Sequence, residues 1–245
     1  MKTIIFLIVV SFGLLNVTGI YGQENFVRND TITAKQLLKR SIVPITLITV
    51  GSIVSGTSCE QRLQTNIRNK VGDDFEFHID DYVQYAPIVQ MYVADAVGMK
   101  SRNHWFDQTK YLFISNVITA TITHGLKSWI DKTRPNGGEH SFPSGHTTFA
   151  FTNAAVLCNE FRQTSPWFAY SGYAFAVTTG SFRMLNNKHW LSDVLVGAGV
   201  GILITNIVYY FEPLKSFNPF KKSKELILIP QIDDNKLGLY FSYKF

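Results

Sequence analysis

Long apolar stretches separated by short polar ones dominate the middle of the chain. This pattern predicts five helices, over residues 82–99, 109–127, 145–160, 166–183 and 190–212. The last is the most membrane-like, because no charged residue occurs between Val194 and Phe211. Gly197 and Gly201 stand in it at the spacing that lets two helices approach closely. We therefore expect an all-α helical bundle whose core is residues 82–212.

Residues 23–81 are more polar and form a separate N-terminal segment. Within it, Ser41–Cys59 is uncharged but rich in Ser and Thr and broken by Pro and Gly, which favours a packed or re-entrant segment over a full membrane crossing. Residues 60–81 are polar and predict one amphipathic helix. Its apolar residues recur every fourth position: Leu63, Ile67 and Val71.

The first 22 residues have the pattern of a secretory signal peptide. Lys2 gives a short positive start, an apolar run follows from Ile4 to Leu15, and Gly22 precedes a polar stretch. The run is about a dozen residues, short of the ~20 that a membrane-crossing helix needs. We therefore expect cleavage after Gly22.

The tail, residues 213–245, contains two segments rich in β-favouring residues, Glu225–Ile229 and Leu237–Phe245. Residues 232–236 between them are able to turn, so a short C-terminal hairpin is predicted. One hairpin cannot close a barrel. We interpret it as an appendage on the surface.

The amino-acid composition excludes several classes of protein and of binding partner. Of the 245 residues, 46% are hydrophobic and only 17% are charged, which excludes a disordered chain, collagen and a coiled coil. The net charge of +5 suits an anionic substrate or an anionic lipid surface. No dense run of Lys and Arg occurs, so nucleic acid is not an expected partner.

The tetrapeptide Pro143, Ser144, Gly145 and His146 opens one of the predicted helices. The free N–H groups after Ser144 would point at a bound anion, and the helix dipole adds to the attraction. His146 stands in the first turn, where it can donate a proton toward the same anion.

A second histidine follows later in the chain. His189 and Asp193 are four residues apart, so on a helix they share one face and the carboxylate can hold one ring nitrogen. The other nitrogen is then free to act as a nucleophile. Arg183 precedes this pair, and Lys127 and Arg134 stand seven positions apart upstream.

Two histidines, three cations and one helix start suit phosphoryl transfer, because its transition state is rich in anionic oxygen. One histidine would attack phosphorus and the other would protonate the leaving oxygen. No His or Cys pair has metal-ligand spacing. We therefore expect no metal and no cofactor.

Taken together and in this order, the three clusters resemble the three motifs of the type-2 phosphatidic acid phosphatase family, over about residues 80–212. That family also includes bacterial acid phosphatases and vanadium haloperoxidases. The resemblance implies a bundle of that kind, with His189 as the nucleophile that forms a phosphohistidine, Asp193 orienting it and His146 as general acid. It also implies a set of residues that bind the phosphoryl oxygens: Lys127, Arg134, Arg183, Ser144 and Gly145.

One position departs from the family pattern. The family usually has Ser directly before the third-motif arginine, whereas Phe182 occupies that position here and Ser181 stands one earlier. A hydroxyl contact to phosphate is therefore expected to be missing.

The resemblance implies hydrolysis of a phosphate monoester or diphosphate, on a lipid such as phosphatidic acid, phosphatidylglycerol phosphate, undecaprenyl diphosphate or lipid A. Two alternatives stay open: a soluble periplasmic acid phosphatase with small substrates, and a non-catalytic lipid-binding relative. A haloperoxidase ranks third, because the chain is short and the second motif has a single histidine.

The predicted helices place all motifs at one end of the bundle and several Lys and Arg residues at the other. Because positive loops stay in the cytoplasm, we expect an inner-membrane protein of the bacterial envelope whose site faces the periplasm. A soluble periplasmic protein is the second expectation.

Overall fold

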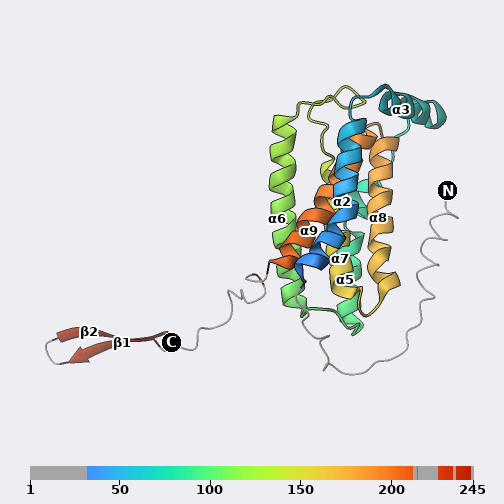
Figure 1. Cartoon of the computed structure of the whole chain (residues 1–245). Helices are drawn as coiled ribbons and strands as arrows, with labels where there is room; N and C mark the ends of the chain where they lie inside the picture. The colour runs from blue at the N-terminus through green and yellow to red at the C-terminus, as the bar shows by residue number, and fades with distance from the viewer. Residues whose placement is uncertain (1–31, 212–213, 215–225, 234–235, 244–245) are drawn as a thin grey trace. The chain divides into compact units, whose positions relative to one another are not determined.

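The computed structural model describes residues 32–211, 214, 226–233 and 236–243 (Figure 1). The described residues up to Phe211 belong to one compact unit, and the two strands near the C-terminus belong to a second. The predicted signal peptide, residues 1–22, lies outside the described residues and stays a prediction.

Over residues 32–211 the first unit contains helices and no strand (Figure 1), which confirms the predicted all-α bundle. Its helices are α2 (Ala34–Val54), α3 (Ser58–Val71), α4 (Asp80–Val83), α5 (Ala86–Ala96), α6 (Trp105–Trp129), α7 (Gly145–Phe161), α8 (Pro166–Leu185) and α9 (Leu191–Tyr210). The single helix predicted over 82–99 is instead divided between α4 and α5. Pro87 stands in the first turn of α5, where its missing N–H costs no hydrogen bond.

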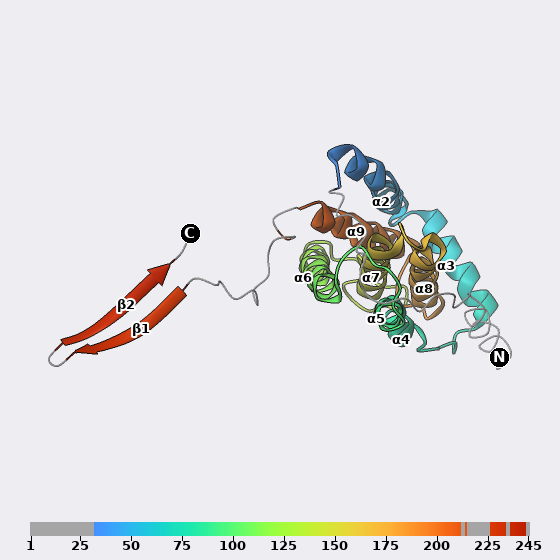
Figure 2. The same cartoon turned by 90° about the horizontal axis from the view of Figure 1, so that it is seen from below.

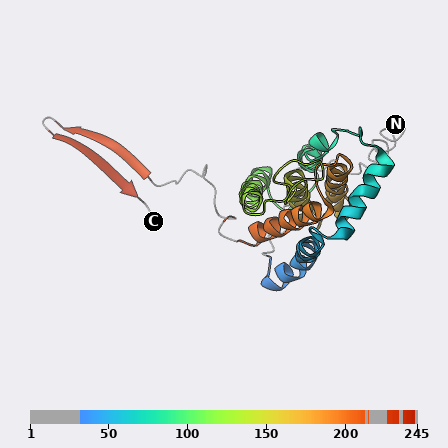
Figure 3. The same cartoon turned by 90° about the horizontal axis from the view of Figure 1, so that it is seen from above.

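Helix α7 is the centre of the bundle. Seen along their axes, α5, α6, α8 and α9 surround it (Figures 2 and 3). Its side chains are buried almost without interruption from Thr147 to Phe161. The surrounding helices therefore hold α7 in a fixed place. The first turn of α7 belongs to the predicted anion site, so that turn is fixed as well.

Close packing of α9 on α7 confirms the prediction made from the two glycines. A Cβ added at Gly197 would lie 2.9 Å from the Ser144 carbonyl oxygen, and one at Gly201 would lie 2.7 Å from that of Thr148. Only glycine permits this approach. It sets the second and third turns of α9 directly against the first turns of α7.

Helix α2 differs from the expectation for Ser41–Cys59. A continuous 21-residue helix with Pro44 inside it covers most of that stretch, so a re-entrant form is wrong. The helix is packed, as expected, but against α9: a Cβ on Gly199 would lie 2.6 Å from the Pro44 carbonyl oxygen, and one on Gly51 2.8 Å from Val196 Cγ2. Small residues on both helices allow this contact.

Helix α3 also corrects the sequence interpretation. The amphipathic helix predicted over 60–81 ends at Val71, where Gly72 takes a positive φ of 88°. Its buried side chains are Glu60 and Gln64, whereas Leu63 is exposed. Polar contacts, not an apolar face, therefore attach this helix to the rest of the bundle.

The outer surface of the bundle is unusually apolar. Two helices in the described part of the chain, α2 and α9, are long and apolar enough to cross a membrane. Trp105 and Trp167 are exposed at one end of the bundle and Trp129 at the other. Tryptophan is enriched at both interfaces of a membrane, so this distribution suits a bundle embedded in lipid.

The second unit is a two-stranded antiparallel hairpin, and it confirms the predicted one. Strand β1 (Leu226–Asp233) pairs with β2 (Lys236–Tyr243), in a register that runs from Leu226 opposite Tyr243 to Asp233 opposite Lys236.

Candidate active site

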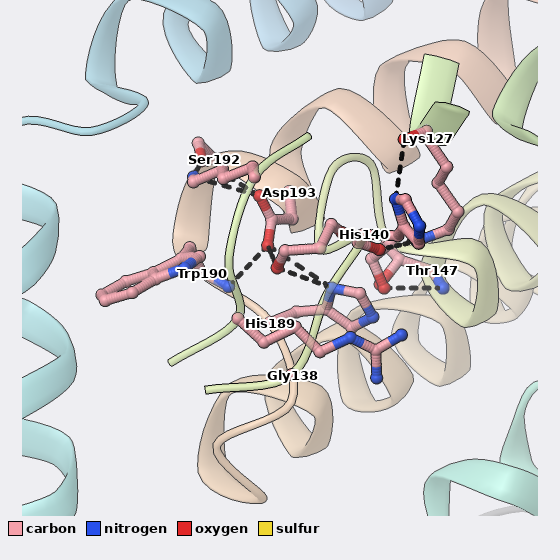
Figure 4. Close-up of polar contacts among 12 residues, drawn as sticks. Lys127, Gly138, His140, Thr147, His189, Trp190, Ser192 and Asp193 are labelled. Atoms are coloured by element: carbon pink, nitrogen blue, oxygen red, sulfur yellow. Dashed lines mark hydrogen bonds and ion pairs between the residues drawn. The ribbon is translucent and has the colours of Figure 1, made fainter. Parts of the chain in front are cut away.

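The three motifs meet at one end of the bundle, as the helix directions predicted. Helices α6 and α8 end there, and α7 and α9 begin there. The Ser144 backbone N–H donates to the Asp193 carbonyl oxygen at 3.0 Å, which ties the second motif to the third. In Figure 4, His189 lies between the Asp193 side and the Lys127 side of this cluster.

His189 lies in the connection between α8 and α9 and is only 2% exposed. Its Nδ1 lies 3.4 Å from Asp193 Oδ2, so Nε2 is the ring nitrogen that does not face Asp193. Burial lowers the pKa of His189 to about 4, and the charges of Lys127 and Arg183 add to this against the opposing effect of Asp193. The ring is therefore neutral near pH 7, the form in which Nε2 has a free electron pair.

Asp193 is fully buried, and five groups contact its carboxylate, the Ser192 hydroxyl at 3.4 Å among them. Its carboxylate accepts from the Trp190 backbone N–H at 2.9 Å, from the Ser141 hydroxyl, and from Lys132 Nζ at 3.1 Å, in addition to facing His189. This carboxylate is thus fixed before any substrate binds. Figure 4 shows several of these contacts converging on it.

Lys132 and Glu60 form a buried pair behind Asp193 that sequence reasoning missed. Lys132 Nζ lies 3.1 Å from Glu60 Oε2 and donates to the Ser192 hydroxyl at 2.6 Å. Glu60, from α3, also accepts from the Ser192 backbone N–H at 2.9 Å. Lys132 stands between the Lys127 and Arg134 of the first motif, so the sequence did offer a signal that it lies near the site. No feature of the local sequence indicated that Glu60 does.

The loop between α6 and α7 orders the first-motif cations. Lys127 Nζ donates to the His140 carbonyl oxygen at 2.7 Å, a contact drawn in Figure 4. Arg134 Nε donates to the Glu139 carbonyl oxygen at 3.0 Å, and its backbone N–H donates to that of Gly138 at 2.7 Å. Both cations are therefore held at the loop that borders His189.

The second motif begins α7 as predicted. Ser144 is its N-cap, and the buried hydroxyl accepts from Thr147 Oγ1 at 2.9 Å. The Ser144 hydroxyl thus caps the N-terminus of α7, and its contact to phosphate stays a prediction. No atom lies within 4 Å of a Cβ added at Gly145, which leaves space next to the N–H groups of the first turn. Such groups bind anions readily.

The third-motif arginine is 9% exposed and pairs with a carboxylate that the sequence did not indicate. Arg183 NH1 lies 2.7 Å from Asp80 Oδ2, on α4. Phe182, in the position where the family has Ser, packs against Phe77 with ring centroids 5.7 Å apart, and Ser181 is exposed. This position therefore contacts the segment before α4.

Within the described residues, no group of three or more His, Cys, Asp or Glu side chains is placed to hold a metal ion. The positive charges near His189 come from Lys127 and Arg183.

Comparison with known proteins shows what this site is similar to. Residues 120–216, which contain all three motifs, match the model of the PAP2 superfamily. This part of the chain is therefore similar to the PAP2 superfamily. The chain is 34% identical over 145 residues to a lipid A 1-phosphatase of Porphyromonas gingivalis, an alignment that covers 57% of this chain and 32% of the relative. It therefore spans about a third of that protein's length.

Among solved structures, a transmembrane PAP2-type phosphatidylglycerolphosphate phosphatase from Bacillus subtilis superposes with a TM-score of 0.50 at 19% identity, covering 73% of this chain and 99% of that one. For LpxE of Aquifex aeolicus the TM-score is 0.49 at 19% identity, with 64% and 99% covered. The Bacillus likeness shows a shared fold.

Proposed function

We propose that this chain is a lipid phosphatase that hydrolyses a phosphate monoester or diphosphate through a phosphohistidine intermediate. The observation that carries the proposal is the neutral, buried His189, held by Asp193 beside three cations and a helix N-terminus. Fixed positive charge and N–H donors stabilise the oxygen-rich transition state of phosphoryl transfer.

In the first step, His189 Nε2 attacks phosphorus while the bond from phosphorus to the leaving oxygen breaks. His146 gives its proton to that oxygen, and the alcohol leaves. In the second step, His146 takes a proton from water as the water oxygen attacks the phosphohistidine. The nitrogen–phosphorus bond then breaks, phosphate leaves, and both histidines regain their starting forms.

The apolar outer surface favours a lipid over a small soluble ester. Large apolar side chains are exposed along α2, among them Leu38, Ile42 and Ile53 at 70%, 61% and 70%. A substrate with acyl chains can reach the site from the same lipid phase. Among the lipids that the resemblance implies, the name of the Porphyromonas relative favours a phosphate on lipid A.

A phosphate-release panel tests the proposed function. Purified protein in detergent with EDTA throughout is expected to release phosphate from lipid A, phosphatidic acid, phosphatidylglycerol phosphate or undecaprenyl diphosphate at least about tenfold faster than from glycerol phosphate. EDTA should not matter, because lysine and arginine supply the positive charge. Faster turnover of soluble esters would favour an acid phosphatase. Activity restored only by Mg²⁺ would contradict the mechanism, and no turnover at all would favour a non-catalytic relative.

The orientation of the site follows from the direction of α2. Its first turns lie at the end away from the site, where Arg40 NH1 donates to Asn159 Oδ1 at 3.2 Å, and Gly51 lies next to the start of α9. If α2 and α9 both cross the membrane, Ala34 and Tyr210 lie on the same side. We propose that this side is cytoplasmic and that the site faces the periplasm. The cations that support this orientation are Lys35, Lys39, Arg40, Lys100, Arg102 and Arg162, and the cations at the site end outside the motifs are Arg62, Arg68, Lys70 and Lys188.

If α2 crosses the membrane, this orientation is incompatible with the predicted cleavage after Gly22. The orientation places the start of α2 in the cytoplasm, whereas cleavage would leave the new N-terminus outside the cytoplasm. Cysteine labelling in intact spheroplasts decides the orientation. In a Cys59→Ser background, Glu139→Cys is expected to react with a membrane-impermeant thiol reagent, and Gln163→Cys at the opposite end only after permeabilisation. The reverse pattern would place the site in the cytoplasm. Labelling of both would favour a soluble periplasmic protein.

A further inference from the structure

Each histidine of the site faces a carboxylate, but the two carboxylates come from different parts of the chain. Asp193, which faces His189, belongs to the third motif. The partner of His146 is Asp81 on α4, whose Oδ1 lies 3.1 Å from His146 Nε2. Asp81 lies outside the three motifs and outside residues 120–216, the part that matches the family model.

The third motif itself fixes the segment that carries Asp81. Asn186 clamps the backbone of Phe77 on both sides: its Oδ1 accepts from the Phe77 N–H at 3.0 Å, and its Nδ2 donates to the Phe77 carbonyl at 2.9 Å. Phe182 packs on the Phe77 ring, and Arg183 pairs with Asp80. The residue that departs from the family pattern, Phe182, is therefore part of the contact that brings Asp81 to the site.

We propose that Asp81 is a positioning residue that orients His146 and favours its protonated form, as Asp193 orients His189. The inference rests on the proposed phosphatase function. Asp81 holds Nε2–H, so Nδ1 faces the leaving oxygen and gives up the proton as the bond to phosphorus breaks. The charges that act on His146 are Asp81 and Asp80 from α4 and Arg183 from α8, while His78 approaches Asp81 Oδ2 at 3.5 Å.

The electrostatic effect has a definite sign. Burial lowers the pKa of His146 and the Arg183 charge lowers it further, whereas the charges of Asp81 and Asp80 and the hydrogen bond to Asp81 oppose this by favouring the imidazolium. Removing the Asp81 charge therefore makes His146 lose its proton at lower pH. Because the general acid must start each turnover protonated, the alkaline limb of the kcat/KM profile reports this loss.

The test compares two substrates that differ in their need for an acid. Asp81→Asn is expected to slow release from an alkyl phosphate by about 10-fold to 100-fold. Release from p-nitrophenyl phosphate, whose leaving group departs without a proton, should fall less than about threefold. The alkaline limb for the alkyl substrate should move down by about one pH unit. Because the Asp81 side chain is 43% exposed, the asparagine variant should fold.

Asp74→Asn is the matched control, because Asp74 is an exposed carboxylate in the same segment. It should leave both rates and the profile unchanged, while Asp81→Glu should recover part of the alkyl rate. Equal losses on both substrates with an unmoved profile would assign Asp81 a structural role only and overturn the inference. So would a faster Asp81→Asn enzyme, since Asp81 would then compete with substrate. Inactivity of the wild-type protein on every substrate would instead sink the proposed function.

Discussion

Replacing His189 with alanine is expected to abolish turnover, by about 10⁴-fold or more, while the protein stays folded. The reason is that no other described side chain can take its place: His189 is the histidine whose ring is buried against Asp193. His146, the other histidine of the site, faces Asp81 instead. The measurement is phosphate release at saturating lipid substrate, compared with thermal unfolding of the same preparations.

His124→Ala is the control, because His124 is exposed on α6 one turn before Lys127. It should retain wild-type turnover. Trapping with ³²P-labelled substrate should place acid-labile, alkali-stable phosphate on His189 of the wild-type protein, because a nitrogen–phosphorus bond breaks in acid. Label on another residue, or substantial activity in His189→Ala, would remove His189 from the role of nucleophile.

The second large effect is expected at Asp193. Asp193→Asn should lower kcat by about 10²-fold to 10⁴-fold with little change in KM, because an amide no longer fixes the His189 tautomer with Nδ1 protonated and Nε2 free. It also cannot stabilise the positive charge that develops on the ring during attack. The neighbouring Lys132 keeps its ion pair with Glu60, so the substitution leaves no lone buried cation.

Asp95→Asn serves as the matched control for that substitution. Asp95 is a carboxylate on α5 that accepts from Gln108 Nε2 at 2.9 Å, near the start of α6 and so at the opposite end of the bundle. Its substitution should leave kcat unchanged. A normal kcat for Asp193→Asn, or a loss that follows only from unfolding, would show that the carboxylate does not act on His189.

Two acids and two histidines therefore form paired units at one end of the bundle. In each unit the carboxylate sets the orientation of a ring nitrogen, and burial differs between them: His189 is 2% exposed, whereas the His146 side chain is 36% exposed. This difference suits their proposed roles. A nucleophile must stay neutral and fixed, while a general acid must exchange its proton with water between turnovers.

Much of the site was predictable because its signals are local. The sequence Pro143–His146 predicts the N-terminus of a helix, and the free N–H groups of a helix N-terminus attract anions. The four-residue spacing of His189 and Asp193 predicted that the two side chains meet, although His189 lies just before α9 and not on a shared helix face. The spacing of Gly197 and Gly201 likewise predicted that another helix approaches α9 closely, and two segments of β-favouring residues with a turn between them predicted the hairpin. Each of these depends on backbone geometry within a few residues.

What the sequence alone did not determine are the contacts between polar residues far apart in the chain. Glu60 and Asp80 are fully buried, yet each stands in a polar segment that periodicity interprets as solvent-exposed. Only docking against the third motif, 132 and 103 residues away for Ser192 and Arg183, gives them partners. The form of α2 was missed for the same reason: Pro44 and Gly51 look like breaks in a helix until α9 supplies the surface that they pack against. Side-chain identity fixes local geometry, but burial of a charge depends on a partner that only the folded chain provides.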